Sequence, residues 1–315
     1  MNTIPAPSAL AEIDTLFSNV DPEVVWHKAM GIIQRISPDF DPSLSRTIFY
    51  DVMLLFHGKF PGYGAIKTMY HDLPHTLDVF LCSMRLMHGM HVSGIHFSDE
   101  EILLVFIATL MHDIGYAQRE GEEDGTGAQF TKSHVTRGID FMQDYLDELK
   151  CPPTYASSLK FIMRSTDVDF PFKDISFPDQ RTRLLAQIVG TADIVGQMAD
   201  RTYPEKLQYL YLEFKEANIG DYQSTYDLMC QTKNFYEVIR EKLDSAYEGL
   251  YTKLSFFFLD TMGVNKNFYL ESIEKNIAFL LKVTTLNEEQ YYSALKRGSR
   301  TEKFLKFLNG RDPAL

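Results

Sequence analysis

The sequence has little cysteine, no excess of basic residues and no long apolar run. Its three cysteines, Cys82, Cys151 and Cys230, are odd in number and far apart, which argues against a disulfide framework and favours a reducing compartment. A formal net charge of -12 argues against a nucleic-acid-binding surface, which is usually basic. The most apolar short run, residues 256–259, is far too short to span a membrane. With no basic and apolar leader after Met1, we expect a cytoplasmic protein that binds neither membranes nor nucleic acids.

The remaining composition is that of a globular chain with a large core. Hydrophobic residues make up 45% of the 315 residues and charged residues 23%, an ordinary balance for a folded protein. The apolar residues recur with helical rather than alternating spacing. We therefore predict an all-α fold, with a catalytic body over residues 44–215. Residues 1–43 would form an N-terminal helical extension, and residues 216–315 a C-terminal helical region packed on the body.

The dipeptide His112-Asp113 is the centre of a predicted metal site. It closes the strongly apolar run 102–111, so both side chains are expected to be buried. A buried charge without a partner is costly, and a carboxylate at the end of a helix also meets the negative end of its dipole. A divalent cation accounts for both residues.

Two further residues complete the predicted ligand set. His75 falls in the first turn of a helix expected from about Pro74 to His88, and Asp193 lies in an apolar helix expected from about Gln180 to Asp200. The mixed nitrogen and oxygen donors of His75, His112, Asp113 and Asp193 suit Zn, Fe, Mn, Ni, Co or Mg and leave positions open for water and substrate. Structural zinc sites prefer cysteine and are closed, so a catalytic site is favoured.

The order of these motifs resembles the HD-domain superfamily of metal-dependent phosphohydrolases. The residues that carry the resemblance are Tyr70-His71-x-x-x-His75-x-x-Asp78-Val79, His112-Asp113 and Asp193. The first element, and Ser165-Thr166-Asp167, are similar to those of class I cyclic-nucleotide phosphodiesterases. The match covers about residues 65 to 200. It implies an HD-domain helical bundle, the four metal ligands named above, and His71 as the proton donor to the leaving oxygen.

Several positions depart from the phosphodiesterase pattern. Asp72 replaces an asparagine, Tyr116 replaces a second histidine after the His-Asp pair, and a downstream histidine pair is reduced to His134. No glutamine-and-phenylalanine element that would hold a base is found after Asp193. We therefore expect hydrolysis of a phosphoester rather than specifically of a cyclic nucleotide. One or two ions could bind, with Asp113 as the bridge and a second ion relying on Asp113, His134 and water.

Other residues near the motif have expected roles around the site, and for most of them two alternatives stay open. Asp78 is expected to orient a ligand histidine one turn away. His134 would contact metal or substrate, or be an ordinary residue at a helix start, and Asp167 would support the site or simply end a helix. Tyr70 precedes the proton donor and would support it or contact substrate. Basic residues that could reach a substrate phosphate are Lys132, Arg137, Lys160, Arg164 and Arg201.

The sequence thus predicts a metal-dependent phosphohydrolase that acts on a small phosphorylated substrate, nucleotide or related, through metal-activated water. The main alternative is a non-catalytic signalling or scaffold protein with the same helical fold, because the histidines for a second metal are missing. A structural metal protein is a third, minor reading. The aromatic-rich segment from Tyr203 to Phe214 is expected to be core or a dimer face rather than a base-stacking platform, and the aromatic C-terminal third makes a helical homodimer plausible.

Overall fold

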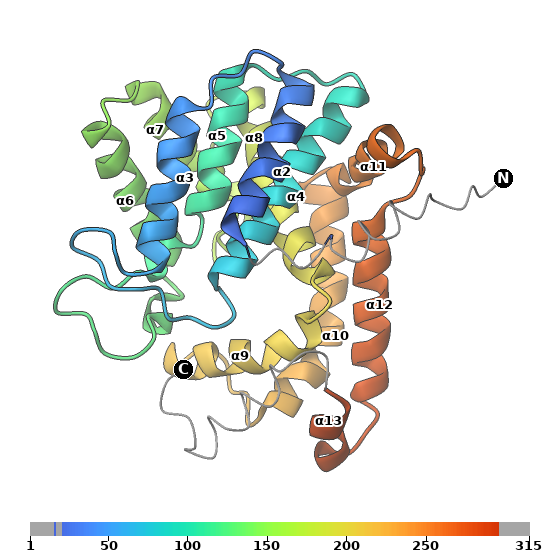
Figure 1. Cartoon of the computed structure of the whole chain (residues 1–315). Coiled ribbons are helices and arrows are strands. Elements are labelled where there is room, and N and C mark those ends of the chain that lie inside the picture. Colours follow the sequence, from blue (N-terminus) through green and yellow to red (C-terminus); the bar gives the residue numbers. More distant parts are fainter. Residues whose placement is uncertain (1–15, 17–20, 296–315) are drawn as a thin grey trace.

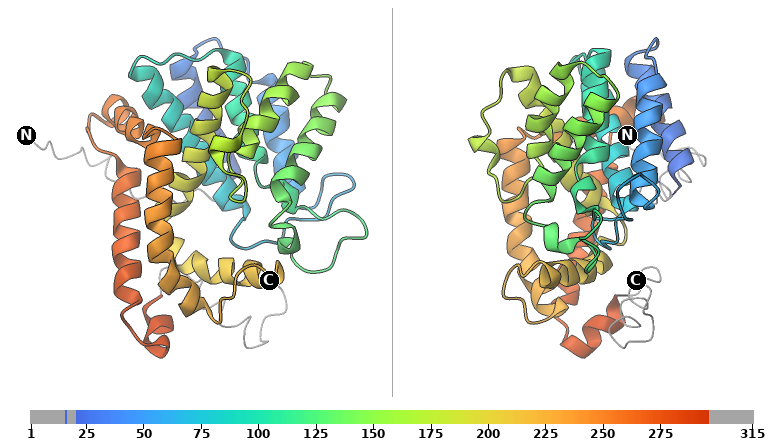
Figure 2. Two further views of the ribbon diagram at one scale, coloured as in Figure 1. Left: turned by 180° about the vertical axis from the view of Figure 1, so that it is seen from behind. Right: turned by 90° about the vertical axis from the view of Figure 1, so that its left-hand side faces the viewer.

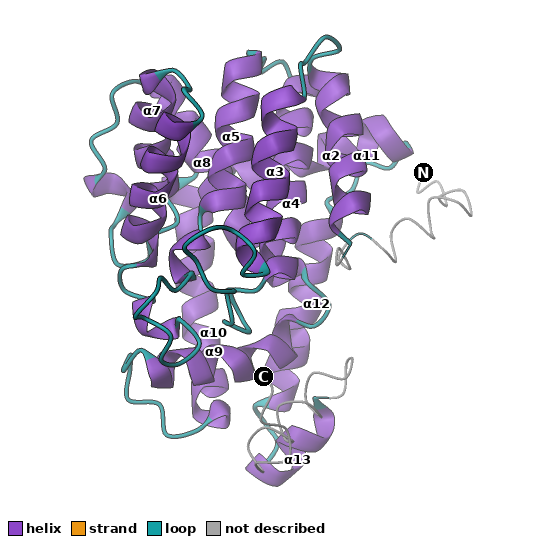
Figure 3. Ribbon diagram, turned by 60° about the vertical axis from the view of Figure 1, so that its left-hand side comes forward, coloured by secondary structure: helices purple, strands orange, loops and turns teal. Residues whose placement is uncertain are grey.

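The computed structural model describes residue 16 and residues 21–295 (Figure 1). In this part of the chain every regular element is a helix and none is a β-strand (Figure 3). The only pairing of β type within it is an isolated bridge between Tyr63 and Arg119. The predicted all-α class is therefore confirmed. None of the helices described is both long and apolar enough to cross a membrane.

The described helices follow one another along the chain, with longer connections between α3 and α4 and between α5 and α6. The α-helices are α2 (Pro22–Ile36), α3 (Ser43–Phe56), α4 (Leu73–Val92), α5 (Asp99–Met111), α6 (His134–Glu148), α7 (Pro153–Arg164), α8 (Gln180–Ala199), α9 (Tyr203–Glu216), α10 (Thr225–Glu241), α11 (Leu254–Met262), α12 (Phe268–Val283) and α13 (Glu288–Ala294). The short helices are η1 (Ile114–Tyr116), η2 (Ala128–Phe130), η3 (Phe172–Asp174), η4 (Lys242–Ala246) and η5 (Leu250–Lys253).

Side-chain caps fix where the three central helices begin. The carboxylate of Asp72 accepts a hydrogen bond from the backbone N–H of His75 at 2.9 Å and so starts α4. Ser98 starts α5 through a reciprocal capping box with Glu101, and Asp179 starts α8. Such caps satisfy N–H groups that have no partner within the helix. The cap on α4 also holds His75 in the first turn.

Helices α4, α5 and α8 pack together in the middle of the molecule. α4 is the innermost, because every residue from His75 to Met90 is buried. Gly196 lets α8 approach closely, since a Cβ at that position would lie 3.1 Å from Cα of Val79 in α4. This close approach brings the Asp193 end of α8 alongside the start of α4.

The N-terminal and C-terminal helices pack directly on this centre. α2 lies against α4, α11 lies against α4, and α12 lies against α8. α10 and α12 run side by side along one flank, and α9 crosses one end of the bundle (Figures 1 and 2). The predicted boundaries at residues 43 and 215 remain predictions.

The end of α4 differs from the sequence expectation. The helix was expected to stop near His88, but it continues to Val92. Gly89 therefore lies inside the helix and has a packing role. A Cβ there would collide with the backbone carbonyl of Lys253 at the start of α11, so the glycine allows the two helices to touch.

Candidate metal centre

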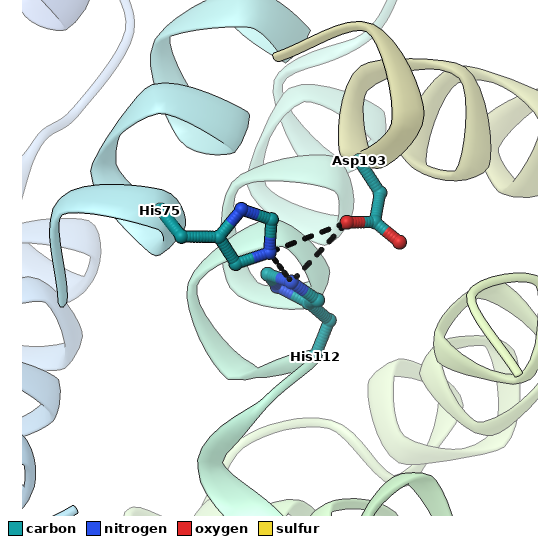
Figure 4. A group of neighbouring side chains, drawn as sticks. All are labelled: His75, His112 and Asp193. Atoms are coloured by element: carbon teal, nitrogen blue, oxygen red, sulfur yellow. Dashed lines mark hydrogen bonds and ion pairs between the residues drawn. The ribbon is translucent and has the colours of Figure 1, made fainter. Parts of the chain in front are cut away.

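Three helices bring a compact group of ligand atoms together. His75 comes from the start of α4, His112 follows the end of α5, and Asp193 comes from α8 (Figure 4). One ligand atom from each of these residues lies within 4.8 Å of the others, so the group could hold a metal ion. Nε2 of His75 is 3.2 Å from Nε2 of His112 and 3.4 Å from Oδ1 of Asp193. Sequence reasoning had named all three residues as ligands.

Asp113 lies against the same group. Its Oδ2 is 3.1 Å from Nε2 of His112 and 3.3 Å from Nε2 of His75. Among the described residues this buried oxygen has no hydrogen-bond partner. A buried carboxylate oxygen left in that state is costly, and a cation bound between these atoms would remove the cost. The donor set and this unsatisfied oxygen both fit a divalent metal ion.

The histidine tautomers suit metal binding. Nδ1 of His112 donates to the carbonyl of Thr109 at 2.8 Å, and Nδ1 of His134 donates to the carbonyl of Thr131 at 2.6 Å. Because a carbonyl oxygen only accepts, the proton sits on Nδ1 and leaves the lone pair of Nε2 facing the site. Nε2 of His134 lies 3.4 Å from Oδ1 of Asp113. His134 thus faces the far side of the same carboxylate.

The electrostatics of the group show how strongly it favours a positive charge. Burial disfavours a charged ring at His112, yet the Asp113 carboxylate outweighs burial and raises the pKa of His112 to about 9. Burial likewise favours a neutral Asp113, but the neighbouring His112 and His71 hold the pKa of this carboxyl well below its usual range. The ring of His134 behaves differently, because burial lowers its pKa. Two carboxylates in one buried group need protons or a metal cation, and metal binding displaces such protons.

His71 faces the group from the side and is held by a residue that the sequence did not single out. Its Nδ1 is 2.7 Å from Oε2 of Glu213 in α9. Oε1 of Glu213 also accepts the backbone N–H of Tyr70 at 2.6 Å. Burial opposes a charge on His71, but Glu213 and Asp113 outweigh burial, so the pKa of His71 is raised above its ordinary value.

Three neighbouring rings line one side of the site. The Tyr116 ring stacks against His71 and against His134, with ring centroids 4.9 Å and 4.5 Å away and interplanar angles of 20° and 14°. The two imidazoles are also close to each other, with centroids 6.1 Å apart and planes tilted by 32°. Tyr116 is fully buried, so it packs against both imidazoles and restricts their orientation.

The remaining predicted residues lie near the site with different roles. Asp78 is buried one turn after His75, but Nδ1 of His75 has no hydrogen-bond partner among the described residues, so the expected support of that ring is not seen. The Asp167 carboxylate accepts a hydrogen bond from Arg164 at 3.0 Å and another from the backbone N–H of Asp169. These contacts favour the second of its two expected roles, that of a residue that ends a helix. Tyr70 is buried, and its ring meets the His71 ring edge-on.

A cavity of ≈ 100 Å³ opens beside these residues. Its lining comprises His71, Asp113, His134, Thr166, Val168, Asp193, Ile194, Gln197, Met198, Tyr203, Phe235 and Ile239. Helices α9 and α10 supply the last three of these residues. The sequence had treated the segment from Tyr203 to Phe214 as core or dimer surface, and this interpretation missed Tyr203 and Glu213. A carboxylate on the buried face of an aromatic helix was the available signal.

Comparison with known proteins gives one partial match. A model of the family described as Npun_R2479-like matches residues 119–254, which is less than half of the chain. The matched segment contains His134, Asp193 and Glu213, and begins after Asp113. No curated protein and no solved structure matches the chain.

Proposed function

We propose that this chain is a metal-dependent phosphohydrolase of the HD type that cleaves a phosphoester. The observation that carries the proposal is the convergence of His75, His112 and Asp193 beside the unsatisfied Oδ2 of Asp113. Of these residues, Asp113 and Asp193 line a cavity that His71 also lines. A divalent cation held there would polarise a phosphoryl oxygen and lower the pKa of an attacking water. Zn, Fe, Mn, Ni, Co and Mg all suit such donors to some degree.

His71 is the proposed proton donor to the leaving oxygen. The contact of Nδ1 with Glu213 leaves Nε2 of the ring available to a substrate in the cavity. The raised pKa of His71 favours a protonated ring near neutral pH, which is what a general acid requires. Oε1 of Glu213 also accepts hydrogen bonds from the backbone N–H groups of Tyr70 and His71. Glu213 would therefore fix the position of the proton donor and favour its protonated state.

We propose that Asp113 would use both of its carboxylate oxygens to hold metal. Its Oδ2 faces His75 and His112, whereas its Oδ1 faces His134. A single ion would be held by Oδ2 of Asp113 together with His75 and His112. A second ion would depend on Asp113, His134 and water, because Tyr116 occupies the position of a further histidine in the family that the sequence resembles.

The test is metal analysis of the purified protein followed by a panel of nucleotides and other phosphoesters. We expect one or two equivalents of a transition metal and metal-dependent release of phosphate or of a phosphorylated product. His112→Ala should lose most of the metal and at least about a hundredfold in rate. His27→Ala is the matched control, since His27 is exposed on α2 and should keep both.

The proposal fails if His112→Ala and Asp113→Ala proteins keep full metal content and full turnover. A metal that stays bound without turnover on any substrate would favour the alternative of a non-catalytic signalling or scaffold protein. The three cysteines are free, which supports a reducing compartment, and we propose the cytoplasm. A homodimer and the absence of nucleic-acid binding stay predictions.

A further inference from the structure

The outer part of the cavity, where the exposed side chains of Val168 and Phe235 lie, is apolar. Ile194, Met198 and Ile239 also line the cavity, together with the polar residues Thr166, Gln197 and Tyr203. The lining residues next to the candidate ligands, His71, Asp113, His134 and Asp193, suit a phosphoryl group held with a metal. The apolar residues offer nothing to a charged or strongly hydrated group, because polar groups pay a desolvation cost against such a surface.

Large apolar side chains are also exposed around this outer part. Val168 is 71% exposed and Phe235 is 50% exposed, although both line the cavity. Phe170 lies two residues beyond Val168, and Val238 lies one turn beyond Phe235 on α10; both are exposed too. These four are among nine exposed large hydrophobic residues described in the structure. Exposed apolar side chains grouped at a cavity mark a binding surface more often than isolated ones.

No arginine or lysine is among the described residues that line the cavity. Two of the basic residues suggested by the sequence are engaged elsewhere: Arg137 pairs with Glu122 at 2.7 Å, and Arg164 pairs with Asp167. Three carboxylates, Asp113, Asp193 and Glu213, instead lie in or directly behind the cavity wall. A chain of several phosphates needs several cationic partners. A bound metal and a protonated His71 would serve one phosphoryl group, and the described lining offers no arginine or lysine for further phosphates.

The size of the cavity agrees with a small substrate. Its volume of ≈ 100 Å³ is below the roughly 150 Å³ that holds a benzene ring. The space beside the ligand group therefore suits one phosphoryl group, and a compact organic group would lie at the open side of the cavity, against the exposed Val168 and Phe235.

We propose that the substrate carries a single phosphoryl group esterified to an uncharged apolar group, which rests against Phe235 and Val168. This proposal rests on the proposed phosphohydrolase function and narrows it. Compounds with two or more linked phosphates are excluded as good substrates. Phe235 and Val168 are the specificity-determining residues, because they contact the organic group and not the reacting phosphorus.

The experiment is isothermal titration calorimetry of the full-length protein, loaded with the metal that it retains best, against three probes. Phenylphosphonate and methylphosphonate share one head group and differ only in the organic group, and their C–P bond is not hydrolysed. Tripolyphosphate supplies the linked phosphates. We expect phenylphosphonate to bind at least about fivefold more tightly than methylphosphonate, and tripolyphosphate to bind more weakly than phenylphosphonate.

Variants of Phe235 test whether this residue causes the preference for phenylphosphonate over methylphosphonate. Phe235→Ala should remove most of the phenyl preference while leaving methylphosphonate affinity within about twofold, and Phe235→Leu should restore part of it. Leu54→Ala is the control, because Leu54 is an exposed apolar residue outside the cavity lining. It should change neither affinity.

Equal affinity for the two phosphonates, no binding of either, or tighter binding of tripolyphosphate overturns the inference. Metal content and turnover on the phosphoester panel are measured on the same preparation. A protein that holds metal and hydrolyses phosphoesters without a phenyl preference refutes the inference alone. A protein that keeps the phenyl preference but has no metal and no turnover refutes the phosphohydrolase function alone.

Discussion

At the scale of single residues, the pair formed by His71 and Glu213 joins the proposed proton donor to a carboxylate that is distant in sequence. The two residues are 142 positions apart, and their side chains meet at 2.7 Å. Burial alone would lower the pKa of His71, but the negative charges of Glu213 and Asp113 together outweigh burial, and the pKa of His71 is raised. The donor would then remain protonated above the ordinary histidine range.

The pH profile of turnover tests this pair. A raised pKa keeps His71 protonated to higher pH, so activity should fall only as pH rises through that raised value. Glu213→Gln retains an oxygen that can accept from the backbone N–H groups but removes the charge, so the alkaline limb of kcat should move to lower pH. An unmoved limb in this variant would show that His71 is not the group that titrates.

Only part of the site could be read from single residues. His75, His112, Asp113 and Asp193 were identifiable because charged or ligating side chains in apolar helices need partners. Glu213, Tyr203 and Phe235 were not, because each lies in a helix whose aromatic pattern predicts burial without saying what it is buried against. The interpretation of Asp78 as support for His75 depended on a side-chain direction that helical spacing does not determine.

At the scale of elements, glycines decide how closely the helices that carry the site can approach. Gly115 in η1 lies against the first turn of α6, where a Cβ would overlap the carbonyl of His134. The same contact sets the distance between Tyr116 and His134, which are stacked. The contact between η1 and α6 therefore places His134 beside Oδ1 of Asp113.

Gly115→Ala should lower the free energy of unfolding by about 1–3 kcal/mol, because overpacking against a backbone atom forces the elements apart. Gly31→Ala is the matched control. Gly31 lies inside α2 with nothing within 4 Å of its Cβ position, so alanine should raise that free energy by about 0.5–1 kcal/mol. Urea unfolding of both variants measures the difference, and changes of the same sign would contradict this account.

At the scale of the whole molecule, the candidate metal centre joins the three central helices. Its ligands come from α4, the end of α5 and α8, and these helices pack on one another. A cation bound by all three would act as a cross-link that exists only in the folded chain. The folded state would then be stabilised in proportion to the logarithm of metal concentration.

Removal of metal should therefore lower the Tm of the whole protein. Metal at a hundred times its Kd contributes about 2.7 kcal/mol, so for a chain of this length a chelator should reduce Tm by about 4 °C. Differential scanning calorimetry with and without chelator gives the shift. His75→Ala should abolish the response and His27→Ala should preserve it; an equal response in both variants would locate the stabilising metal elsewhere.

The sequence by itself determined the all-α class, the starts of the central helices and the residues able to bind a metal. These features depend on local properties: helical spacing, capping side chains and the cost of placing charge in an apolar segment. The tertiary structure alone decided that Glu213 reaches His71, that Tyr116 stacks against both His71 and His134, and that Phe235 lines the cavity. Each of these is a contact between helices far apart in sequence, and local periodicity specifies which face of a helix is buried but not which helix covers it.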